Sequence, residues 1–262
     1  VRARFLSLEY FNFHVSIINL DKEIVAKDSE NKCDLEQPVT EARIVAHWDN
    51  IFKDREWGKY PDINLVRYLS RSDMFAPTTQ ARRALELGSG PGSNLSLLAK
   101  SNCEIWCIDG SETAMAQAKS RLSREGLLSN LKDATCGQLT EINYPASFFD
   151  LIIDIEALST NSFESALIIS QKVIEALKPG GRFFGKTFSD VTTVDGTQVS
   201  YNYFDNNKKI FAGMGPVRIS TRSDIFKLFE SPTTKVRMIE RDDRVFENEA
   251  IISEWCFEVE KT

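Results

Sequence analysis

The sequence contains very little histidine, an odd number of cysteines and no long apolar run. Its 262 residues include two histidines and five cysteines, and no two cysteines form a Cys-x-x-Cys pair. These counts exclude the usual ligand sets of zinc and iron sites, so we expect no metal. Unpaired thiols are typical of a reducing compartment, and we expect a cytoplasmic protein. No stretch approaches roughly 18 unbroken apolar residues, so we expect no membrane span.

Positively charged residues are fewer than negatively charged ones. The chain has 32 Lys and Arg residues against 38 Asp and Glu residues, a net charge of −6 and a pI of about 5.2. A protein that binds chiefly through phosphate contacts is usually basic, so this balance argues against nucleic acid as the partner. The apolar fraction of 42% and the charged fraction of 27% are ordinary for a globular chain.

The length of the chain allows one large α/β domain or two small ones. Residues 1–45 read as an N-terminal extension with no assignable structure, aromatic at first and then polar and acidic. Helical spacing begins near Ile44 and again after Pro61-Asp62. We therefore expect an extension over residues 1–45 and a single domain over residues 46–262.

Predicted strands and helices alternate through the middle of the chain. Apolar runs predict strands at 83–87, 104–108, 131–136, 149–155 and 182–188. Amphipathic stretches predict helices at 93–100, 111–122 and 162–177. Such alternation is typical of a parallel sheet with helices on both faces.

The C-terminal part departs from this alternation. Residues 191–220 form a long connection, a kind of segment that is often functional. Thr221 and Asp224 are spaced as a capping box and predict a short helix. Two strands follow at about 234–241 and 251–260. No crossover helix fits between them, so we expect them to pair antiparallel.

A glycine turn follows the first predicted strand. Gly88, Gly90 and Gly92 let the backbone turn sharply and approach a ligand, and the next helix presents its N-terminus there. Dinucleotide enzymes use a similar turn, but their third glycine comes one residue later, where this chain has Ser93. A tight turn that binds no ligand is the alternative interpretation.

Asp109 ends the second predicted strand, 21 residues after Gly88. A carboxylate at this position can accept hydrogen bonds from both hydroxyls of a ribose, which favours a nucleoside without choosing the cofactor. The alternative is a carboxylate that only stabilises the N-terminus of the helix beginning near Ser111.

These motifs together resemble the class I S-adenosylmethionine-dependent methyltransferases. Residues 86–92 (Glu-Leu-Gly-Ser-Gly-Pro-Gly) match the family's glycine motif, and Asp109 occupies its ribose-binding acidic position. Residues 149–153 resemble its fourth-strand motif and 177–181 its turn before strand five. The resemblance covers residues 46–262. It implies an α/β, Rossmann-like doubly wound fold, with a mostly parallel seven-stranded sheet and a C-terminal antiparallel strand pair.

The resemblance also implies S-adenosyl-L-methionine as the cofactor and assigns roles to individual residues. Glu86 should order the turn and reach the amino group of the methionine part, while Gly88 and Gly90 pass under the cofactor. Gln138 stands where the family usually has an acid, and its amide can bind the adenine amino group. The expected cofactor-binding residues are Glu86, Gly88, Ser89, Gly90, Gly92, Asp109, Gly110, Gln138, Leu139, Asp154 and Trp57.

Methyl transfer asks the protein chiefly to align the acceptor with an already activated sulfonium and to exclude water. A hydroxyl acceptor would benefit from a general base. Asp154 and Glu156, two residues apart on one predicted strand face, are the first candidates, and His47 on the N-terminal helix is the other. The alternatives are that Asp154 only binds cofactor and that His47 lies on a helix surface.

Aromatic side chains are further candidates around the acceptor. Trp57 and Tyr60 could cap the sulfonium or the acceptor by cation–π contact, or could pack between the N-terminal helices. Tyr201, Tyr203 and Phe204 lie in the long connection, where they could line an acceptor pocket or hold the loop against the sheet.

The expected function is methyl transfer to a small-molecule acceptor. Residues 57–61 and 154–158 resemble bacterial small-molecule or carbohydrate methyltransferases, and O-methylation of a hydroxylated metabolite or sugar is favoured over N-methylation. The alternatives are a nucleic-acid or protein methyltransferase, a non-catalytic cofactor-binding subunit and a nicotinamide-dependent reductase.

Overall fold

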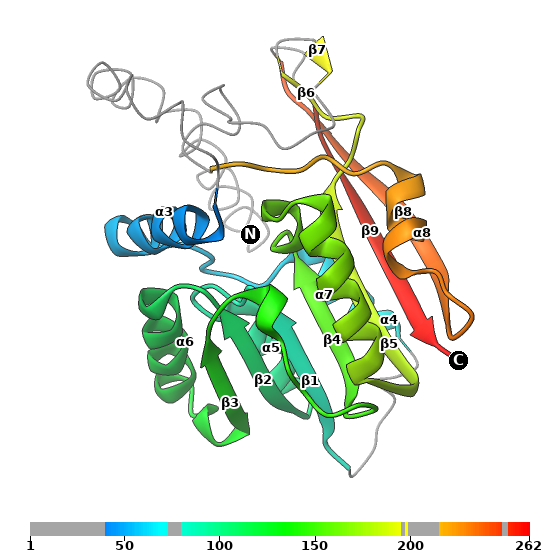
Figure 1. The fold of residues 1–262 in the computed structure, drawn as a ribbon. Helices are drawn as coiled ribbons and strands as arrows, with labels where there is room; N and C mark the ends of the chain where they lie inside the picture. The colour runs from blue at the N-terminus through cyan, green and yellow to red at the C-terminus, as the bar shows by residue number, and fades with distance from the viewer. Residues whose placement is uncertain (1–39, 73–79, 195–196, 199–214, 248–250) are drawn as a thin grey trace, which may run out of the picture.

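The computed structural model describes residues 40–72, 80–194, 197–198, 215–247 and 251–262. The described chain forms one mixed sheet with helices on both of its faces (Figure 1). The long strands are β1 (Arg82–Leu87), β2 (Cys103–Asp109), β3 (Leu131–Cys136), β4 (Phe149–Ile155), β5 (Leu177–Phe188), β8 (Thr234–Val245) and β9 (Ile251–Lys261). The helices are α3 (Glu41–Asp54), α4 (Ile63–Arg71), α5 (Ser93–Lys100), α6 (Glu112–Arg124), α7 (Phe163–Ala176) and α8 (Arg222–Phe229). Short 3₁₀ turns are η2 (Leu128–Asn130), η3 (Leu139–Glu141) and η4 (Leu158–Thr160).

The seven long strands follow the order β3-β2-β1-β4-β5-β9-β8. Strands β1 to β5 pair in parallel, whereas β9 is antiparallel to both β5 and β8. This confirms the predicted mostly parallel sheet with its C-terminal antiparallel pair. The sequence did not predict a small addition, the two-residue strands β6 (Thr193–Val194) and β7 (Thr197–Gln198), of which β6 pairs with the start of β9.

The two faces of the sheet carry separate apolar cores, because neighbouring strand residues point to opposite faces. Phe183 packs with α7 and α8, while Phe184 packs with α4, α5 and α6. Phe184 stacks on Tyr68 of α4 with ring centroids 4.4 Å apart. These buried faces fix the register of the strands, and with it the positions of the polar residues at the strand ends.

Strand β5 begins at Leu177, earlier than predicted, because the turn over 178–181 belongs to the strand. The pairing of β4 with β5 shifts register at this point. Gly181 makes the shift possible, since a Cβ there would lie 2.8 Å from the carbonyl oxygen of Lys178. The capping box at the start of α8 is confirmed: Thr221 and Asp224 bond each other's backbone N–H.

No helix in the described ranges is long and apolar enough to cross a membrane. Within the same ranges no three His, Cys, Asp or Glu side chains gather as metal ligands.

Candidate cofactor and acceptor site

The glycine loop leads from β1 into α5 and requires glycine at two points. Gly88 and Gly92 adopt positive φ angles of 60° and 81°, in the left-handed region that other residues rarely enter. A Cβ on Gly88 would lie 2.2 Å from Cβ of Ala157, and one on Gly92 would lie 2.9 Å from Cβ of Ala118. The loop is therefore pressed between the segment after β4 and helix α6. Ser89, also in the loop, is buried, and its hydroxyl has no partner among the described residues.

Glu86 lies at the end of β1 and is 2% exposed. Its Oε1 accepts a hydrogen bond from Nδ2 of Asn94 at 2.8 Å, whereas its buried Oε2 has no partner among the described residues. Burial raises the pKa of Glu86 to about 8, and the nearby carboxylates of Asp109 and Asp154 add to the rise. A buried acceptor without a donor is unfavourable, so this oxygen suits a ligand that brings a cationic N–H group.

Asp109 connects the glycine loop to the start of α6. Its Oδ2 accepts from the backbone N–H of Gly90 and its Oδ1 from that of Ser111, both at 2.8 Å. Burial raises the pKa of Asp109, and these two hydrogen bonds oppose the rise. The Asp109 side chain thus binds the N-terminus of α6, as one of the two interpretations of the sequence expected. It does so at the position where the family binds ribose. The backbone N–H of Gly137 donates to the carbonyl of Asp109 at 3.0 Å, which brings Gln138 and Leu139 beside this strand end.

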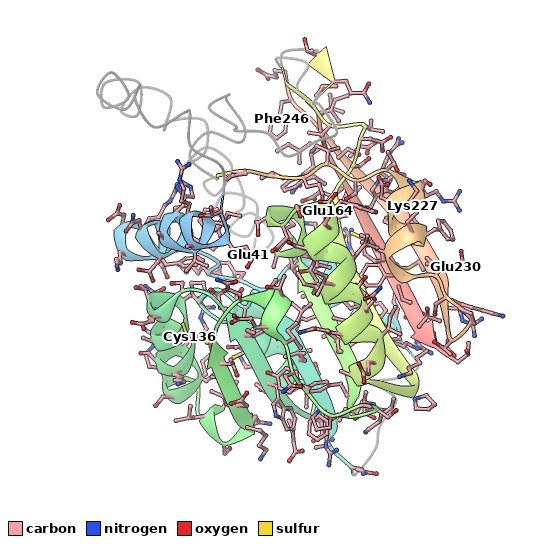
Figure 2. All side chains as sticks on the ribbon, viewed as in Figure 1. Glu41, Cys136, Glu164, Lys227, Glu230 and Phe246 are labelled. Carbon is pink, nitrogen blue, oxygen red and sulfur yellow. The ribbon has the colours of Figure 1, made fainter. Side chains whose placement is uncertain are left out.

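Helix α3 lies across the ends of these strands. A Cβ on Gly110 would lie 2.5 Å from Cγ2 of Val45, and one on Gly90 would lie 3.6 Å from Cζ of Phe52. Glu41 lies at the start of the helix (Figure 2). It accepts hydrogen bonds from Thr140 and Ser165. Helix α3 therefore packs against the glycine loop and the end of β2.

The two predicted acids after β4 are held by different partners. Asp154 is 1% exposed, and its Oδ1 accepts from the backbone N–H of Leu158 at 2.9 Å. Burial raises its pKa to about 7, although the backbone bond to Leu158 and the charge of Arg218 oppose the rise. Strand β4 ends at Ile155, and Glu156 adopts a φ of 68°. Glu156 therefore does not share a strand face with Asp154, contrary to the expectation.

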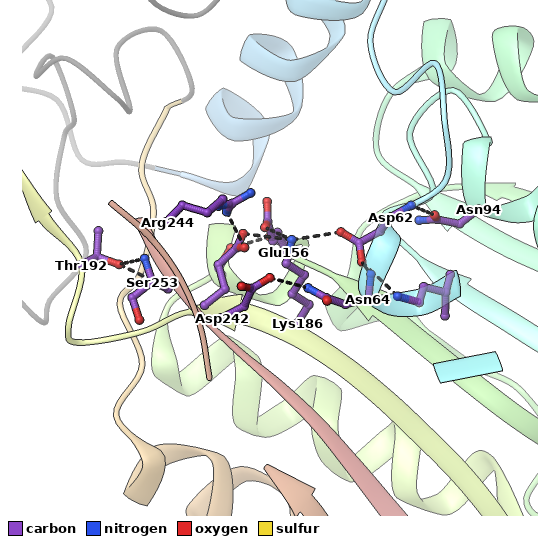
Figure 3. Close-up of polar contacts among 12 residues, drawn as sticks. Asp62, Asn64, Asn94, Glu156, Lys186, Thr192, Asp242, Arg244 and Ser253 are labelled. Atoms are coloured by element: carbon purple, nitrogen blue, oxygen red, sulfur yellow. Dashed lines mark hydrogen bonds and ion pairs between the residues drawn. The ribbon is translucent and has the colours of Figure 1, made fainter. Parts of the chain in front are cut away.

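Glu156 instead joins a buried charged group centred on Lys186, which we call the Lys186 cluster (Figure 3). Nζ of Lys186 lies 3.0 Å from Asp62 Oδ2, 3.2 Å from Glu156 Oε1 and 3.0 Å from Glu254 Oε1. Arg244 forms a second ion pair with Glu254. The cluster thus joins three carboxylates to two cations.

The charged groups of the cluster shift one another's pKa values. Burial acts to lower the pKa of Lys186, but its three carboxylates, led by Glu156, hold it well above its ordinary value. Burial acts to raise the pKa of Glu156, but the charge of Lys186 holds this pKa below its ordinary value. Glu254 behaves oppositely, because burial and the charge of Glu156 raise its pKa to about 8.

Sequence reasoning missed the Lys186 cluster because its members come from distant parts of the chain. Lys186 is on β5, Glu254 on β9 and Arg244 on β8, while Asp62 precedes α4. One local signal was available: Lys186 is the one charged residue in the apolar run from Phe183 to Phe188. A lysine in a buried strand needs partners.

The remaining predicted residues lie around α3. His47 is beside Gly215, where a Cβ would come within 3.0 Å of its Cδ2. Trp57 meets Trp48 edge-on at 5.3 Å, and the Arg55 guanidinium lies 5.4 Å from its ring centroid, as the packing interpretation expected. Tyr60 is 65% exposed. The aromatic residues at 201, 203 and 204 lie outside the described residues.

Comparison with known proteins bears on this geometry. Residues 84–181 match the family described as a methyltransferase domain. A comparison with curated protein sequences found no match. Among solved structures, an S-adenosylmethionine-dependent methyltransferase from Methanosarcina mazei is 14% identical with a TM-score of 0.59, over 77% of this chain and 98% of that one.

Two further structures have the same fold. One, described for the conversion of a disulfide bond into a thioacetal group during echinomycin biosynthesis, is 14% identical with a TM-score of 0.61, over 83% of this chain and 93% of that one. The Burkholderia thailandensis 1,6-didemethyltoxoflavin-N1-methyltransferase is 14% identical with a TM-score of 0.58, over 87% of this chain and 93% of that one.

The strand order and the glycine loop define the fold of a class I methyltransferase. With the family match over 84–181, the chain contains a class I S-adenosylmethionine-dependent methyltransferase domain, and S-adenosylmethionine is its methyl donor. The unpartnered Oε2 of Glu86 and the glycine loop fit this donor, which carries a cationic amino group.

Proposed function

We propose that this enzyme methylates a small molecule at a hydroxyl oxygen, with Asp154 as the general base. The observation that carries the proposal is the position and titration of Asp154. It is the second-last residue of β4 and pairs with Leu87, the last residue of the strand that leads into the glycine loop, and burial raises its pKa to about 7. A base that titrates near neutral pH can accept a hydroxyl proton and release it again, which contributes about 10²–10⁴-fold to a rate.

Glu156 and His47 are weaker candidates for the base. Nζ of Lys186 lies 3.2 Å from Oε1 of Glu156 and favours the charged form of this carboxylate. Glu156 is therefore a poorer proton acceptor than Asp154. His47 is on α3, the helix that packs against the glycine loop, and lies beside Gly215. We propose positioning or acceptor-binding roles for both.

The charge balance supports a small acceptor over a nucleic acid. The chain has 32 Lys and Arg residues against 38 Asp and Glu residues, and the Lys186 cluster joins three carboxylates to two cations. This balance provides no excess of positive charge for a polyanion. The toxoflavin-type methyltransferase of the same fold acts on a small molecule, at a nitrogen. Nitrogen is accordingly the second candidate for the atom methylated.

For the cofactor we propose the residues of the glycine loop and its neighbours: Glu86, Gly88, Ser89, Gly90, Gly92, Asp109, Gly110, Gln138, Leu139, Asp154 and Trp57. S-adenosylmethionine supplies the activated methyl group. The chain holds its amino-acid part near Glu86, and α3 keeps water from the strand ends.

The test uses labelled S-adenosylmethionine and fractionated metabolite pools. Label should appear in a small hydroxylated product, and D154N should reduce its formation about 10²-fold at saturating S-adenosylmethionine, where a weaker affinity for the cofactor no longer limits the rate. D150N is the matched control, because Asp150 lies at the other end of β4 and bonds Arg83 and Lys178. Transfer of label only to RNA or protein would refute the small-molecule assignment, and transfer to an amine would refute the hydroxyl.

A further inference from the structure

One side chain decides which oxygen of Glu86 is free. Asn94 lies in the first turn of α5 and is 7% exposed. Its Nδ2 donates to Glu86 Oε1 at 2.8 Å, and its Oδ1 accepts from the backbone N–H of Asp62 at 2.9 Å. Both ends of the amide are therefore used; the contact with Glu86 is buried and the contact with Asp62 is partly buried.

The direction of the Asn94 amide is fixed by chemistry. A backbone N–H can only donate, so the amide oxygen must face Asp62 and the amide nitrogen must face Glu86. The nitrogen can only donate in turn, so Glu86 Oε1 must be an acceptor. This leaves Glu86 Oε2, which has no partner among the described residues, as the oxygen available to a ligand.

Asp62 is itself held firmly. Its Oδ1 caps α4 by accepting from the backbone N–H groups of Asn64 and Leu65, at 2.9 and 3.1 Å. Its Oδ2 accepts from Lys186 Nζ at 3.0 Å (Figure 3). Displacing Asp62 would break a helix cap and a buried ion pair together, and it therefore forms a rigid anchor for Asn94.

We propose that Asn94 is a positioning residue for the methyl donor, acting through Glu86, and that Asp62 and Lys186 anchor it. Asn94 occupies Oε1 and leaves Oε2 as the acceptor for the donor's amino group. The proposal rests on the proposed binding of that amino group by Glu86. It adds that a buried polar chain extends from this carboxylate to Lys186, which also holds Glu156.

The test compares two ligands by calorimetry. S-adenosylhomocysteine carries the amino-acid part, whereas 5′-methylthioadenosine keeps the nucleoside and sulfur but lacks it. N94L should weaken S-adenosylhomocysteine about tenfold, since a hydrogen bond to a charged group is lost. Binding of methylthioadenosine should change less than about twofold. S96A is the matched control, because Ser96 is a buried polar residue of the same helix that bonds Gly92 and Glu125 instead.

A double-mutant cycle separates action through Glu86 from general damage. In the E86Q background, N94L should cause no further loss of S-adenosylhomocysteine affinity. Equal weakening of both ligands by N94L, or a second tenfold loss in the E86Q background, would overturn the proposal. If N94L does not fold, as judged by circular dichroism, N94A is put through the same comparisons.

The cycle also distinguishes the role of Glu86 from that of Asn94. If E86Q leaves the preference for S-adenosylhomocysteine over methylthioadenosine unchanged, the proposed role of Glu86 fails. If E86Q abolishes that preference while N94L retains it, only the role of Asn94 fails. In N94L the pH dependence of S-adenosylhomocysteine binding should also move to higher pH, because the donor that opposes the raised pKa of Glu86 is gone.

Discussion

Gly88 shows how strongly a single position is constrained in this loop. It combines a φ of 60° with a Cβ position 2.2 Å from Cβ of Ala157. An alanine there would adopt an unfavourable backbone conformation and would also overlap sterically with Ala157. Gly126 provides a natural comparison, because it has a φ of 71° with open space around its Cβ position. The two glycines therefore separate conformational strain from steric overlap.

We expect G126A to lower the free energy of unfolding by about 1–2 kcal/mol, the cost of the left-handed conformation alone. G88A should cost more, about 3 kcal/mol or above, because Ala157 must also move. Urea unfolding of both variants measures the difference. Equal losses would mean that the segment after β4 yields freely and does not press on the loop.

Glu86 connects cofactor binding to pH. Burial raises its pKa to about 8 in the ligand-free protein, so it is largely protonated at pH 7. A cationic amino group at Oε2 favours the charged form, and binding should therefore release close to one proton at pH 7. Affinity for S-adenosylhomocysteine should accordingly rise as the pH increases toward 8.

Calorimetry of S-adenosylhomocysteine binding in buffers of different ionisation enthalpy counts this proton. E86Q should abolish the release, whereas E164Q, a substitution on α7 away from the glycine loop, should retain it. Binding without proton release in the unaltered protein would contradict the assignment of Glu86 to the amino group.

Among the elements, α3 is joined to the start of α6 beside the glycine loop. Asp49, in the middle of this helix, accepts hydrogen bonds from the Ser111 hydroxyl and the Thr113 backbone at the start of α6. Lys53 and Ser111 hold the pKa of Asp49 well below its usual range, so these bonds persist across the physiological range.

We expect D49A to loosen α3 and to speed dissociation of S-adenosylhomocysteine about tenfold, the effect of losing hydrogen bonds to a charged group. D54A, at the exposed end of the same helix, should leave the rate unchanged within about twofold. Stopped-flow displacement measures both rates. Identical rates in D49A and the unaltered protein would mean that α3 does not retain the cofactor.

Local patterns predicted the elements well where one segment contains the whole signal. The run over 149–155 and the capping box at Thr221 needed no information from elsewhere, and both are confirmed. The Lys186 cluster could not be predicted in this way, because its five members come from five separate segments that meet only after folding. The positive φ of Glu156 could not be predicted from the sequence either. Because of it, the Glu156 side chain does not share a strand face with Asp154.

For the whole molecule, the buried acids make stability depend on pH. Glu86, Asp154 and Glu254 have pKa values raised to about 8, 7 and 8, chiefly by burial. In the unfolded chain the pKa values of these groups are near their ordinary values of 4.5, 3.8 and 4.5. Between these limits the folded protein binds more protons than the unfolded chain.

Through these three groups, the ligand-free protein should lose stability as the pH rises from about 5 to 8, and the loss should be complete above the folded pKa values. Each acid contributes on the order of 2–4 kcal/mol to this change, since one pKa unit corresponds to about 1.4 kcal/mol. Thermal unfolding from pH 5 to 8.5 measures the slope, which should be shallower in E86Q because one titrating group is gone.

S-adenosylhomocysteine should raise Tm more at pH 8 than at pH 6, because it binds the charged form of Glu86. A melting temperature that rises steadily across this range would show that the carboxylates are not buried in protonated form, and would remove the basis for assigning Asp154 as a base near neutral pH.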